Sequence, residues 1–337
     1  MLAIAEALER GAVDGRLARA LSGVWARTVG RAVARPIDWP PHVRVVAVGG
    51  ATLGGSCKTP LAIACAVELA AAGARTALVG HAYRAKPGHP RFVASDDPID
   101  LVGDEALVAA RALRPIGVPV VVAPTRAAAI ALAAREADVL VLDGVAQTAP
   151  ARASLALLSV DAAEPWGCAS ALPPRGDLRA SLTALLDECD VVVPVADGPR
   201  VEVPGVQSLA LPGREVLPAS AESRGAWVND GSLLTWDRLR SARVGLFLAL
   251  ARPDRVLRSL ARRGVHPRVV VRVRDHGPLS RRAGSTMRRA TDVDLWLATA
   301  KCAFYVPRGL RAPLAALEHT VGLSLALRSR LSRLAMP

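Results

Sequence analysis

A glycine-rich segment between a hydrophobic run and a helical pattern constrains this chain most. Residues 43–48 (VRVVAV) are mostly β-branched and apolar, and they end at Gly49 and Gly50, as a buried strand does. Residues 59–72 then place apolar side chains at helical spacing. A strand, a glycine-rich turn and a helix are the setting of a phosphate-binding loop, where backbone N–H groups and the helix dipole attract anions. The segment therefore predicts an α/β fold built around such a loop.

The predicted nucleotide-binding loop consists of Gly54, Gly55, Ser56, Cys57, Lys58 and Thr59. In a loop of this type the lysine reaches the terminal phosphates and the hydroxyl that follows it holds Mg²⁺. The strict pattern G-x-x-x-x-G-K-[ST] is broken twice, because Thr52 replaces its first glycine and Cys57 its second. A side chain at position 57 would crowd the phosphate path, and a non-glycine residue adopts positive φ only at a cost. A chance glycine-rich turn is the alternative.

Strand and helix patterns alternate along most of the chain. The predicted strands cover residues 43–48, 75–79, 118–122, 139–142, 155–160 and 191–195, and the helices between them 59–72, 104–113 and 126–135. This alternation implies a parallel sheet with right-handed crossovers. Strands at 244–248, 269–273 and 295–298 and a helix at 279–290 follow a Gly- and Pro-rich stretch, residues 197–239, that we read as an irregular or antiparallel insert.

The fold class we predict is α/β, with a P-loop NTPase-like parallel sheet, flanking helices and a smaller C-terminal α/β lobe. Three regions follow from the patterns: an N-terminal amphipathic, membrane-associating region at 1–36, a P-loop kinase core at 37–195, and a second lobe with the insert at 196–337. In the first of these, residues 17–34 mix apolar side chains and Trp25 with three arginines, as an interfacial helix would. An ordinary amphipathic helix packed on the domain is the alternative.

The composition limits the partners. The net charge of +13 favours polyanions, namely nucleic acid, nucleotide phosphates or an anionic membrane, or else reflects an arginine-rich genome composition. The five cysteines show neither metal-ligand spacing nor a disulfide framework, which is typical of a reducing cytoplasm. No run reaches the roughly 18 apolar residues of a membrane-spanning helix. We therefore expect a soluble body with any membrane contact at its surface.

Three short segments occur in a fixed order along the chain: 52–60 (TLGGSCKTP), 102–105 (VGDE) and 143–147 (DGVAQ). Together they resemble the lipid A 4'-kinase family, tetraacyldisaccharide 4'-kinase, which typically reads T-V-G-G-T-G-K-T-P, V-G-D-E and D-D-G-L-Q-H at these points. The resemblance continues through 167–179 (GCASALPPRGDLR), 249–255 (ALARPDR), 275–276 (DH) and 299–303 (TAKCA). It extends from about residue 17 to about residue 305.

The resemblance implies an ATP-dependent kinase that phosphorylates the 4'-hydroxyl of the tetraacyldisaccharide 1-phosphate precursor of lipid A. It also implies ATP and Mg²⁺ as cofactors, an acylated disaccharide lipid as substrate, and a peripheral or monotopic place at the cytoplasmic face of the inner membrane. An anionic membrane surface would be the other partner. We expect no nucleic acid and no obligate protein partner.

The resemblance also implies roles for single residues. Lys58 would stabilise phosphate charge, Thr59 and Asp143 would hold Mg²⁺, and Asp104 would be the catalytic carboxylate, paired with His276 in a dyad. Other matched positions are Gln147, Tyr83 and Asp275. For three of these residues a plain structural role is the alternative: a helix N-cap for Asp104, a strand-end turn for Asp143 and a surface loop for His276.

Several family positions differ in this chain. Cys57 replaces a glycine, and the family's double Asp has become Leu142-Asp143 or Asp143-Gly144, so one carboxylate is missing. The remaining departures are Cys168, Gly277, Ala300 and Cys302. In addition, where the family reads S-R-G-Y-G-G, residues 80–85 read GHAYRA, which keeps the tyrosine but loses the family's arginine. Since a charge that acts in the transition state contributes orders of magnitude in rate, the alternative function is a catalytically impaired paralogue that binds nucleotide or lipid A precursor.

Two further function classes have weaker support. A P-loop ATPase or regulator of the deviant-Walker type often has a second lysine early in its loop, and this loop has none. A nucleic-acid role rests on net charge alone, because the chain has three phenylalanines, two tyrosines and no recognisable binding module.

Overall fold

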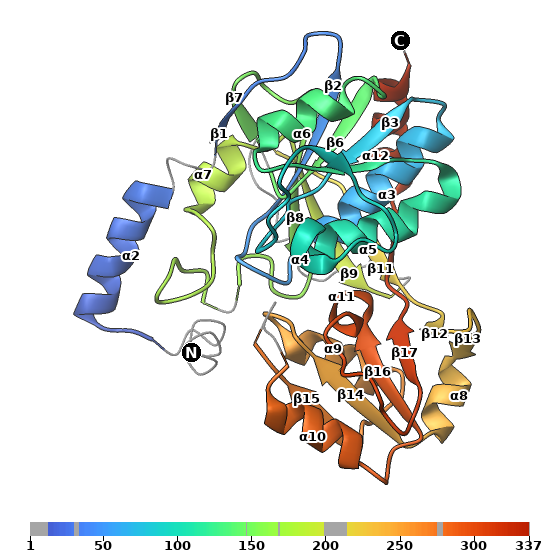
Figure 1. Cartoon of the computed structure of the whole chain (residues 1–337). Coiled ribbons are helices and arrows are strands. Elements are labelled where there is room, and N and C mark those ends of the chain that lie inside the picture. Colours follow the sequence, from blue (N-terminus) through green and yellow to red (C-terminus); the bar gives the residue numbers. More distant parts are fainter. Residues whose placement is uncertain are drawn as a thin grey trace. The chain divides into compact units, whose positions relative to one another are not determined.

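A computed structural model describes residues 13–29, 34–145, 147–167, 169–198, 214–274 and 279–336 (Figure 1). Of the side chains of residues 29, 34–36 and 147–150 nothing is described. The described residues form two compact units. The larger unit comprises residues 13–221 and 321–336, and the smaller unit comprises residues 222–320.

The larger unit is built on a long sheet. The strands of the larger unit are β1 (Ala34–Ile37), β2 (Arg44–Gly50), β3 (Thr76–Val79), β4 (Arg91–Phe92), β5 (Val120–Val122), β6 (Val139–Asp143), β7 (Gln147–Pro150), β8 (Leu155–Asp161), β9 (Val191–Asp197), β10 (Glu215–Val216), β11 (Ala219–Glu222) and β18 (Thr320–Leu323). Of these, β1 and β7 form a separate two-stranded sheet. The helices of the larger unit are α2 (Arg16–Val29), α3 (Lys58–Ala71), α4 (Ile99–Val102), α5 (Asp104–Leu113), the 3₁₀ turn η2 (Arg114–Ile116), α6 (Arg126–Ala133), α7 (Leu182–Asp187) and α12 (Leu325–Ala335). The predicted strands and helices of this region are confirmed.

The described strands of the main sheet follow the order β18-β11-β9-β8-β2-β6-β3-β5-β4, with β10 beside β9. Neighbours from β9 to β5 pair in parallel, and β4 is antiparallel to β5. Strands β2 and β6 are therefore adjacent, and their carboxyl ends meet at one edge of the sheet. This adjacency brings the turn after β2 next to the residues that follow β6.

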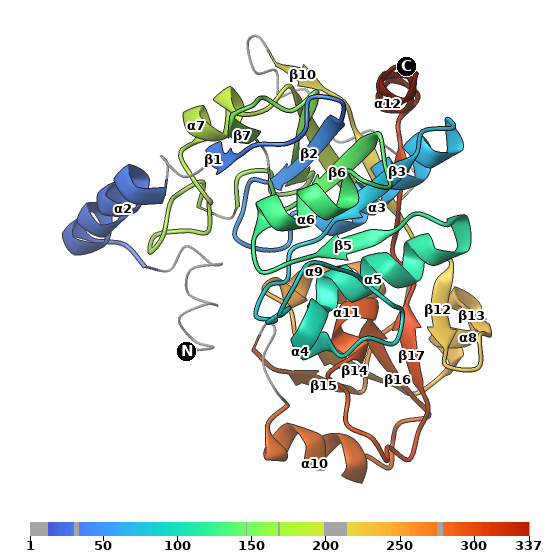
Figure 2. The same ribbon diagram turned by 45° about the horizontal axis from the view of Figure 1, so that its top comes forward.

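The direction of the crossovers decides which helices cover which face (Figure 2). The steps from β2 to β3 and from β3 to β5 run one way across the sheet, whereas the step from β5 to β6 runs back. With right-handed crossovers, α3 and α5 cover one face and α6 the other. Side chains such as Leu61 and Leu69 of α3 are completely buried, as a covering helix requires.

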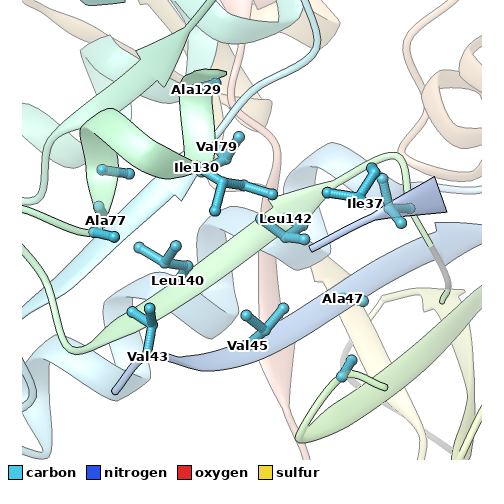
Figure 3. Close-up of a cluster of buried hydrophobic side chains, with 14 of the residues drawn as sticks. Ile37, Val43, Val45, Ala47, Ala77, Val79, Ala129, Ile130, Leu140 and Leu142 are labelled. Carbon is cyan, nitrogen blue, oxygen red and sulfur yellow. The ribbon is translucent and has the colours of Figure 1, made fainter. Parts of the chain in front are cut away.

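The core under α6 is made of small and branched side chains. Ile130 of α6 packs over Leu140 and Leu142 of β6, next to Val45 of β2 (Figure 3). The four side chains are at most 1% exposed. Alanines such as Ala129 let the helix approach the sheet closely, which accounts for the abundance of Ala, Val and Leu and the scarcity of aromatic residues.

The N-terminal helix α2 begins at Arg16 and ends at Val29. The Nε1 of Trp25 donates to the carbonyl of Arg179 at 3.1 Å, and Ser22 Oγ donates to the carbonyl of Leu172 at 3.0 Å. Its larger aliphatic side chains stay exposed, with Leu17 at 74%, Leu21 at 48% and Val24 at 54%. A pocket of about 330 Å³ beside the helix is lined by Leu21, Val24, Trp25, Thr28, Pro173 and Pro174. The helix is thus attached by two hydrogen bonds and keeps an apolar surface.

A short strand lies between α2 and β2. β1 begins at Ala34 and pairs in parallel with β7 over four residues, from Ala34–Gln147 to Ile37–Pro150. Proline at position 36 is compatible with such a short, two-stranded pairing, because only one side of the strand is bonded.

The smaller unit is an α/β layer of its own. Its elements are β12 (Gly225–Val228), β13 (Leu233–Thr235), α8 (Trp236–Ser241), β14 (Val244–Leu248), α9 (Pro253–Arg262), β15 (Val269–Arg272), α10 (Arg281–Arg289), β16 (Leu295–Thr299), α11 (Ala300–Ala303) and β17 (Leu314–Leu317). Leu239 of α8 and Leu260 of α9 pack on one face of the sheet, whereas Met287 of α10 and Cys302 of α11 pack on the other. The predicted second α/β lobe is present.

The boundary between the units lies later than residue 196, because β10 and β11 extend the main sheet beside β9. The predicted antiparallel character of residues 197–239 applies to β12 and β13, which pair antiparallel. The chain returns to the larger unit at residue 321, and Arg328 of α12 forms an ion pair with Glu68 of α3 at 2.9 Å.

Candidate nucleotide and phosphoryl-transfer site

The predicted phosphate loop lies between β2 and α3, as the sequence indicated. Thr52 Oγ1 donates to the carbonyl of Gly54 at 2.7 Å, and Gly55 has a φ of +75°. Cys57 is the N-cap of α3 and takes a left-handed conformation, φ 58° and ψ 22°. A non-glycine residue in this region costs about 1–2 kcal/mol, so the family's glycine is replaced at a position that still demands glycine-like geometry.

The loop is pressed against the ends of two strands. A Cβ at Gly50 would clash with Ser56 Oγ, so β2 must end in glycine for the loop to fold back over it. Ser159 of β8 donates to the carbonyl of Ser56, and both side chains are buried. Arg179 adds a bond from its Nε to the carbonyl of Gly50 at 3.2 Å. The strand ends therefore hold the loop from beneath.

Lys58 and Thr59 point into the same region from the first turn of α3. Lys58 Nζ lies 3.4 Å from Glu105 Oε1, and both side chains are largely buried, at 19% and 15% exposure. Thr59 Oγ1 donates to Asp143 Oδ2 at 2.6 Å in a fully buried contact. The structure thus brings together a lysine, a hydroxyl and a carboxylate from the ends of two adjacent parallel strands.

The carboxylate of Asp143 is buried but incompletely hydrogen-bonded. It is 1% exposed, and within the described part of the chain its Oδ1 has no hydrogen-bond partner. Burial raises the pKa of its carboxyl above the usual range, and the positive charge of Lys58 opposes that rise. A buried carboxylate with an unused oxygen is costly unless a cation neutralises it. Together with the Thr59 hydroxyl, it offers the hard oxygen ligands that Mg²⁺ prefers, so these residues fit the metal.

Asp104 stands at the start of α5, next to this group. Gly103 is the N-cap, and its φ of +88° is a conformation that favours glycine. Asp104 is 2% exposed, and its Oδ1 accepts from the backbone N–H of Glu105 at 2.8 Å. Since Glu105 pairs with Lys58, the VGDE segment adjoins the phosphate loop. A buried aspartate at the first helical position is more than a surface cap, although its proposed chemistry stays a prediction.

The remaining predicted residues have different outcomes. Tyr83 is 42% exposed and lies in a turn in which its ring centroid is 5.9 Å from that of His81. Gln147 is described only through its backbone, in β7. Asp275 and His276 lie outside the described residues, so the predicted dyad of His276 with Asp104 stays a prediction.

Two arginines of the site were not singled out from the sequence. Arg126, the first residue of α6, donates from Nη1 to the carbonyls of Val79 and Gly80 at 3.0 and 2.9 Å, and its charge is among those that lower the pKa of Asp143. Arg179 holds the ends of the phosphate loop. The sequence signal for Arg179 was its place in the segment 167–179, whereas Arg126 had only its position at a helix start to mark it.

Across the ranges that the structure describes, no helix is long and apolar enough to cross a membrane. Nor do the described residues contain a group of three or more His, Cys, Asp or Glu side chains arranged to hold a metal ion. A metal in the phosphate-loop site would therefore need ligands beyond Thr59 and Asp143, such as phosphate oxygens and water, as is usual for Mg²⁺.

The comparison with known proteins follows the same segments. The sequence model of a family described as tetraacyldisaccharide-1-P 4'-kinase matches residues 16–334. A tetraacyldisaccharide 4'-kinase of Methylobacterium sp. (strain 4-46) is 34% identical over 267 residues, which cover 78% of this chain and 75% of that protein. The corresponding protein of Methylobacterium radiotolerans is 31% identical over 312 residues, covering 89% and 88%. The alignment with that of Anaeromyxobacter sp. (strain Fw109-5) is 34% identical and covers 65% of this chain and 61% of the relative.

Among solved structures, the crystal structure of an "apo" form of LpxK from Aquifex aeolicus in complex with ATP resembles this fold. The TM-score is 0.68, the alignment covers 94% of this chain and 98% of that chain, and the sequence identity is 19%. At this identity the likeness concerns the fold, and the predicted α/β class with a P-loop-type sheet is confirmed.

Proposed function

This chain belongs to the tetraacyldisaccharide-1-P 4'-kinase family, and on that premise we propose that it uses ATP to phosphorylate the 4'-hydroxyl of a tetraacyldisaccharide 1-phosphate, the precursor of lipid A. The observation that supports this most is the buried contact between Thr59 and Asp143 beside Lys58. These side chains are the ones that phosphoryl transfer needs at a phosphate loop.

Binding of the nucleotide rests on the loop and on the start of α3. The backbone of residues 54–57 and the N-terminus of α3 supply N–H groups and a partial positive charge toward the phosphates. Lys58 would exchange its contact with Glu105 for the transferred phosphoryl group, or share the two, and stabilise the charge that develops there. Positioning of the phosphates accounts for much of the catalysis at a phosphate loop, and these groups would supply it.

Thr59 and Asp143 are the residues that would hold Mg²⁺. When bound there, the metal supplies charge neutralisation between the phosphate groups. The protein contributes the Thr59 hydroxyl and Asp143 Oδ1, which has no hydrogen-bond partner within the described residues, and both side chains are buried. Arg126 and Lys58 add positive charge around the same carboxylate.

Asp104 is the proposed base. It would accept the proton of the 4'-hydroxyl while the new O–P bond forms and the bond between the β–γ bridging oxygen and the γ-phosphorus breaks, leaving ADP. The bond from the Glu105 N–H fixes one carboxylate oxygen of Asp104 at the start of α5. His276 would tune this base, a role that rests on the family resemblance alone.

The two alignments at Asp143 place the missing carboxylate differently. Leu142 is completely buried in the core under α6, so a carboxylate there would face apolar side chains. Gly144 has a φ of +83°, a conformation that favours glycine, so a residue with a carboxylate would be strained there. We propose that Asp143 is the retained metal ligand under either alignment.

The exposed apolar side chains of α2 support a peripheral place at a membrane. Leu17, Leu21 and Val24 are 74%, 48% and 54% exposed on a helix that also has Arg19 and Arg27. Such a helix suits the boundary between headgroups and acyl chains. We propose the cytoplasmic face of the inner membrane as its location, an anionic surface as its environment, and neither nucleic acid nor an obligate protein as its partner.

The test is a single reaction. Purified protein is incubated with Mg²⁺-ATP and tetraacyldisaccharide 1-phosphate in detergent, and the bisphosphorylated product is measured by mass. Wild type should form product, and Lys58→Ala should not. Product from neither the wild type nor Cys57→Gly would reject the kinase proposal, whereas nucleotide or lipid binding under the same conditions would then support the non-catalytic alternative.

A further inference from the structure

The positive charge of the chain is concentrated in the smaller unit. Residues 222–320 contain 19 Lys and Arg and 8 Asp and Glu, which gives +11 of the total +13. The remaining residues, more than two thirds of the chain, are close to neutral. A genome-wide preference for arginine would spread over both units, so the concentration in one of them calls for a local explanation.

Helix α10 contains the densest part of this charge. It has no acidic residue in its first turn, and Arg281, Arg282, Arg288 and Arg289 are all exposed. At 3.6 residues per turn, these four side chains fall within about 120° of the helix circumference. The opposite side of the helix buries Met287 in the core of the smaller unit. The four arginines therefore form one face of the helix. Arg281 and Arg288 are seven residues apart, as are Arg282 and Arg289.

A neighbouring segment adds two more arginines. Arg288 Nε donates to the carbonyl of Arg308 at 3.4 Å, which places Arg308 beside the C-terminal half of α10, with Arg311 three residues further along the chain. Arg308 and Arg311 are both exposed. We call the six residues the α10 basic face: Arg281, Arg282, Arg288, Arg289, Arg308 and Arg311.

Several acidic side chains in the described part of this unit pair with arginines outside the α10 basic face. Asp292 and Asp294, which follow α10, both pair with Arg243, at 2.8 and 2.6 Å. Asp254 pairs with Arg272 on another part of the unit, and Glu318 pairs with Arg224. Within the ranges that the structure describes, no arginine of the α10 basic face forms an ion pair. Six like charges side by side repel one another, and an external anion would relieve that repulsion.

We propose that the α10 basic face binds the phosphate headgroups of an anionic bilayer. This proposal rests on the proposed function, because a kinase for an acylated substrate must work where that lipid lies. Each guanidinium presents a planar fork that matches two phosphate oxygens, and arginines near an anionic surface each add to the attraction. The face is a docking surface for many lipids and does not bind the substrate itself.

A bilayer suits the face better than nucleic acid does. Single-stranded nucleic acid is typically bound by basic grooves that also contain stacking aromatic rings. The α10 basic face consists of arginines around Ser285 and contains no aromatic side chain. Its charge lies on the exposed side of α10 and on the segment beside it, where several headgroups of a bilayer could contact it at once.

The experiment measures binding of the full-length protein to vesicles that contain no substrate. Vesicles of phosphatidylcholine alone are compared with vesicles that contain phosphatidylglycerol, at low and at high salt. The variants are Arg281→Gln/Arg288→Gln, Arg282→Gln/Arg289→Gln and their fourfold combination. The matched control is Arg238→Gln/Arg268→Gln, which removes two exposed arginines of the same unit outside the face. Thermal unfolding of every variant checks that the fold is unchanged.

Wild type should prefer the anionic vesicles, and each pair of substitutions should weaken that binding about 30-fold, since roughly 1 kcal/mol per arginine corresponds to about fivefold. The control should match wild type within about threefold, and high salt should abolish the difference. The proposal would be overturned if the fourfold variant bound the anionic vesicles as well as the control variant does. The proposal would also be overturned if the wild-type protein bound a labelled oligonucleotide but no vesicles.

The outcome is separate from that of the kinase assay. Substrate in detergent micelles requires no bilayer, so the fourfold variant should keep its turnover there. Turnover without any effect of the substitutions on vesicle binding would reject the α10 basic face and leave the kinase intact. Vesicle binding through the face without turnover in wild type would reject the kinase and leave the face intact.

Discussion

Asp143→Asn should stabilise the ligand-free protein and remove its activity. The wild-type carboxylate is 1% exposed, one of its oxygens accepts from Thr59, and Oδ1 has no partner within the described residues. Leaving such a group buried costs about 1–3 kcal/mol. Asparagine has the same shape and still accepts from Thr59, but it has no charge to desolvate. We therefore expect the free energy of unfolding to rise by about 1–3 kcal/mol in the variant.

The gain in the free energy of unfolding of Asp143→Asn should depend on pH. Burial raises the pKa of the Asp143 carboxyl, so the folded protein keeps this proton to higher pH than the unfolded chain does. The resulting stability is complete below the unfolded value of about 3.9 and is lost as the pH rises through the raised folded value. The amide side chain of the Asp143→Asn variant has no such proton. The difference between variant and wild type should therefore be small at acidic pH and grow toward neutral pH.

The assay is chemical or thermal unfolding of both proteins without Mg²⁺ and nucleotide, repeated at several pH values. For a unit of this size each kcal/mol shifts the melting temperature by about 2–4 °C. The matched control is Asp138→Asn, because Asp138 is an exposed aspartate whose pKa is lowered by its hydrogen bonds to Arg75. That control should gain no stability, and it should lose a little near neutral pH. In the kinase reaction, Asp143→Asn should lose roughly 100-fold or more in kcat.

A ligand-free Asp143→Asn protein that unfolds more easily than wild type would refute this reasoning, because it would show that the carboxylate is well satisfied without a cation. A gain in stability that is the same at all pH values would also count against it. Such a gain would have to come from packing and not from the removed charge. Addition of Mg²⁺-ATP should raise the melting temperature of wild type more than that of the variant.

Three other predictions concern the same framework. Cys57→Gly removes a side chain from a left-handed position and should raise the free energy of unfolding by roughly 1 kcal/mol, measured in urea; a decrease would contradict the strain argument. Lys58→Ala and Asp104→Ala should each abolish product in the kinase assay, and full turnover by Asp104→Ala would refute its assignment as the base. Deleting residues 1–33, before β1, should weaken vesicle sedimentation while turnover in detergent persists, and unchanged sedimentation would exclude α2 as a membrane contact.

Most of the regular structure was predictable from local patterns. The strand at 43–48 and the helix after Lys58 are encoded by a β-branched run and by helical spacing, and both occur within two or three residues of the predicted limits. The pairing of β1 with β7 and the return of α12 to the larger unit were not predictable in this way. Those contacts join segments more than a hundred residues apart, and nothing in either segment alone marks its partner.

The site was predictable to the extent that it rests on motifs. Lys58, Thr59 and Asp143 could be placed together because the ends of adjacent parallel strands meet, and the structure brings them together. Arg126 could not be found in this way, since an arginine at a helix start usually faces water. Its contacts with the carbonyls of Val79 and Gly80 depend on the order β6-β3-β5, which follows from the whole sheet.

The positions at which this chain departs from its family fall into two kinds, and the distinction bears on activity. Cys302, where the family has Asp, is completely buried in the smaller unit, where its sulfur accepts from the backbone N–H of Ala249 at 3.2 Å and burial raises the pKa of its thiol. That substitution exchanges one hydrogen-bond acceptor for another within a core. Cys57 and Gly144, in contrast, lie at the phosphate loop and beside Lys58. We therefore expect Cys57→Gly to increase turnover more than Cys302→Asp does.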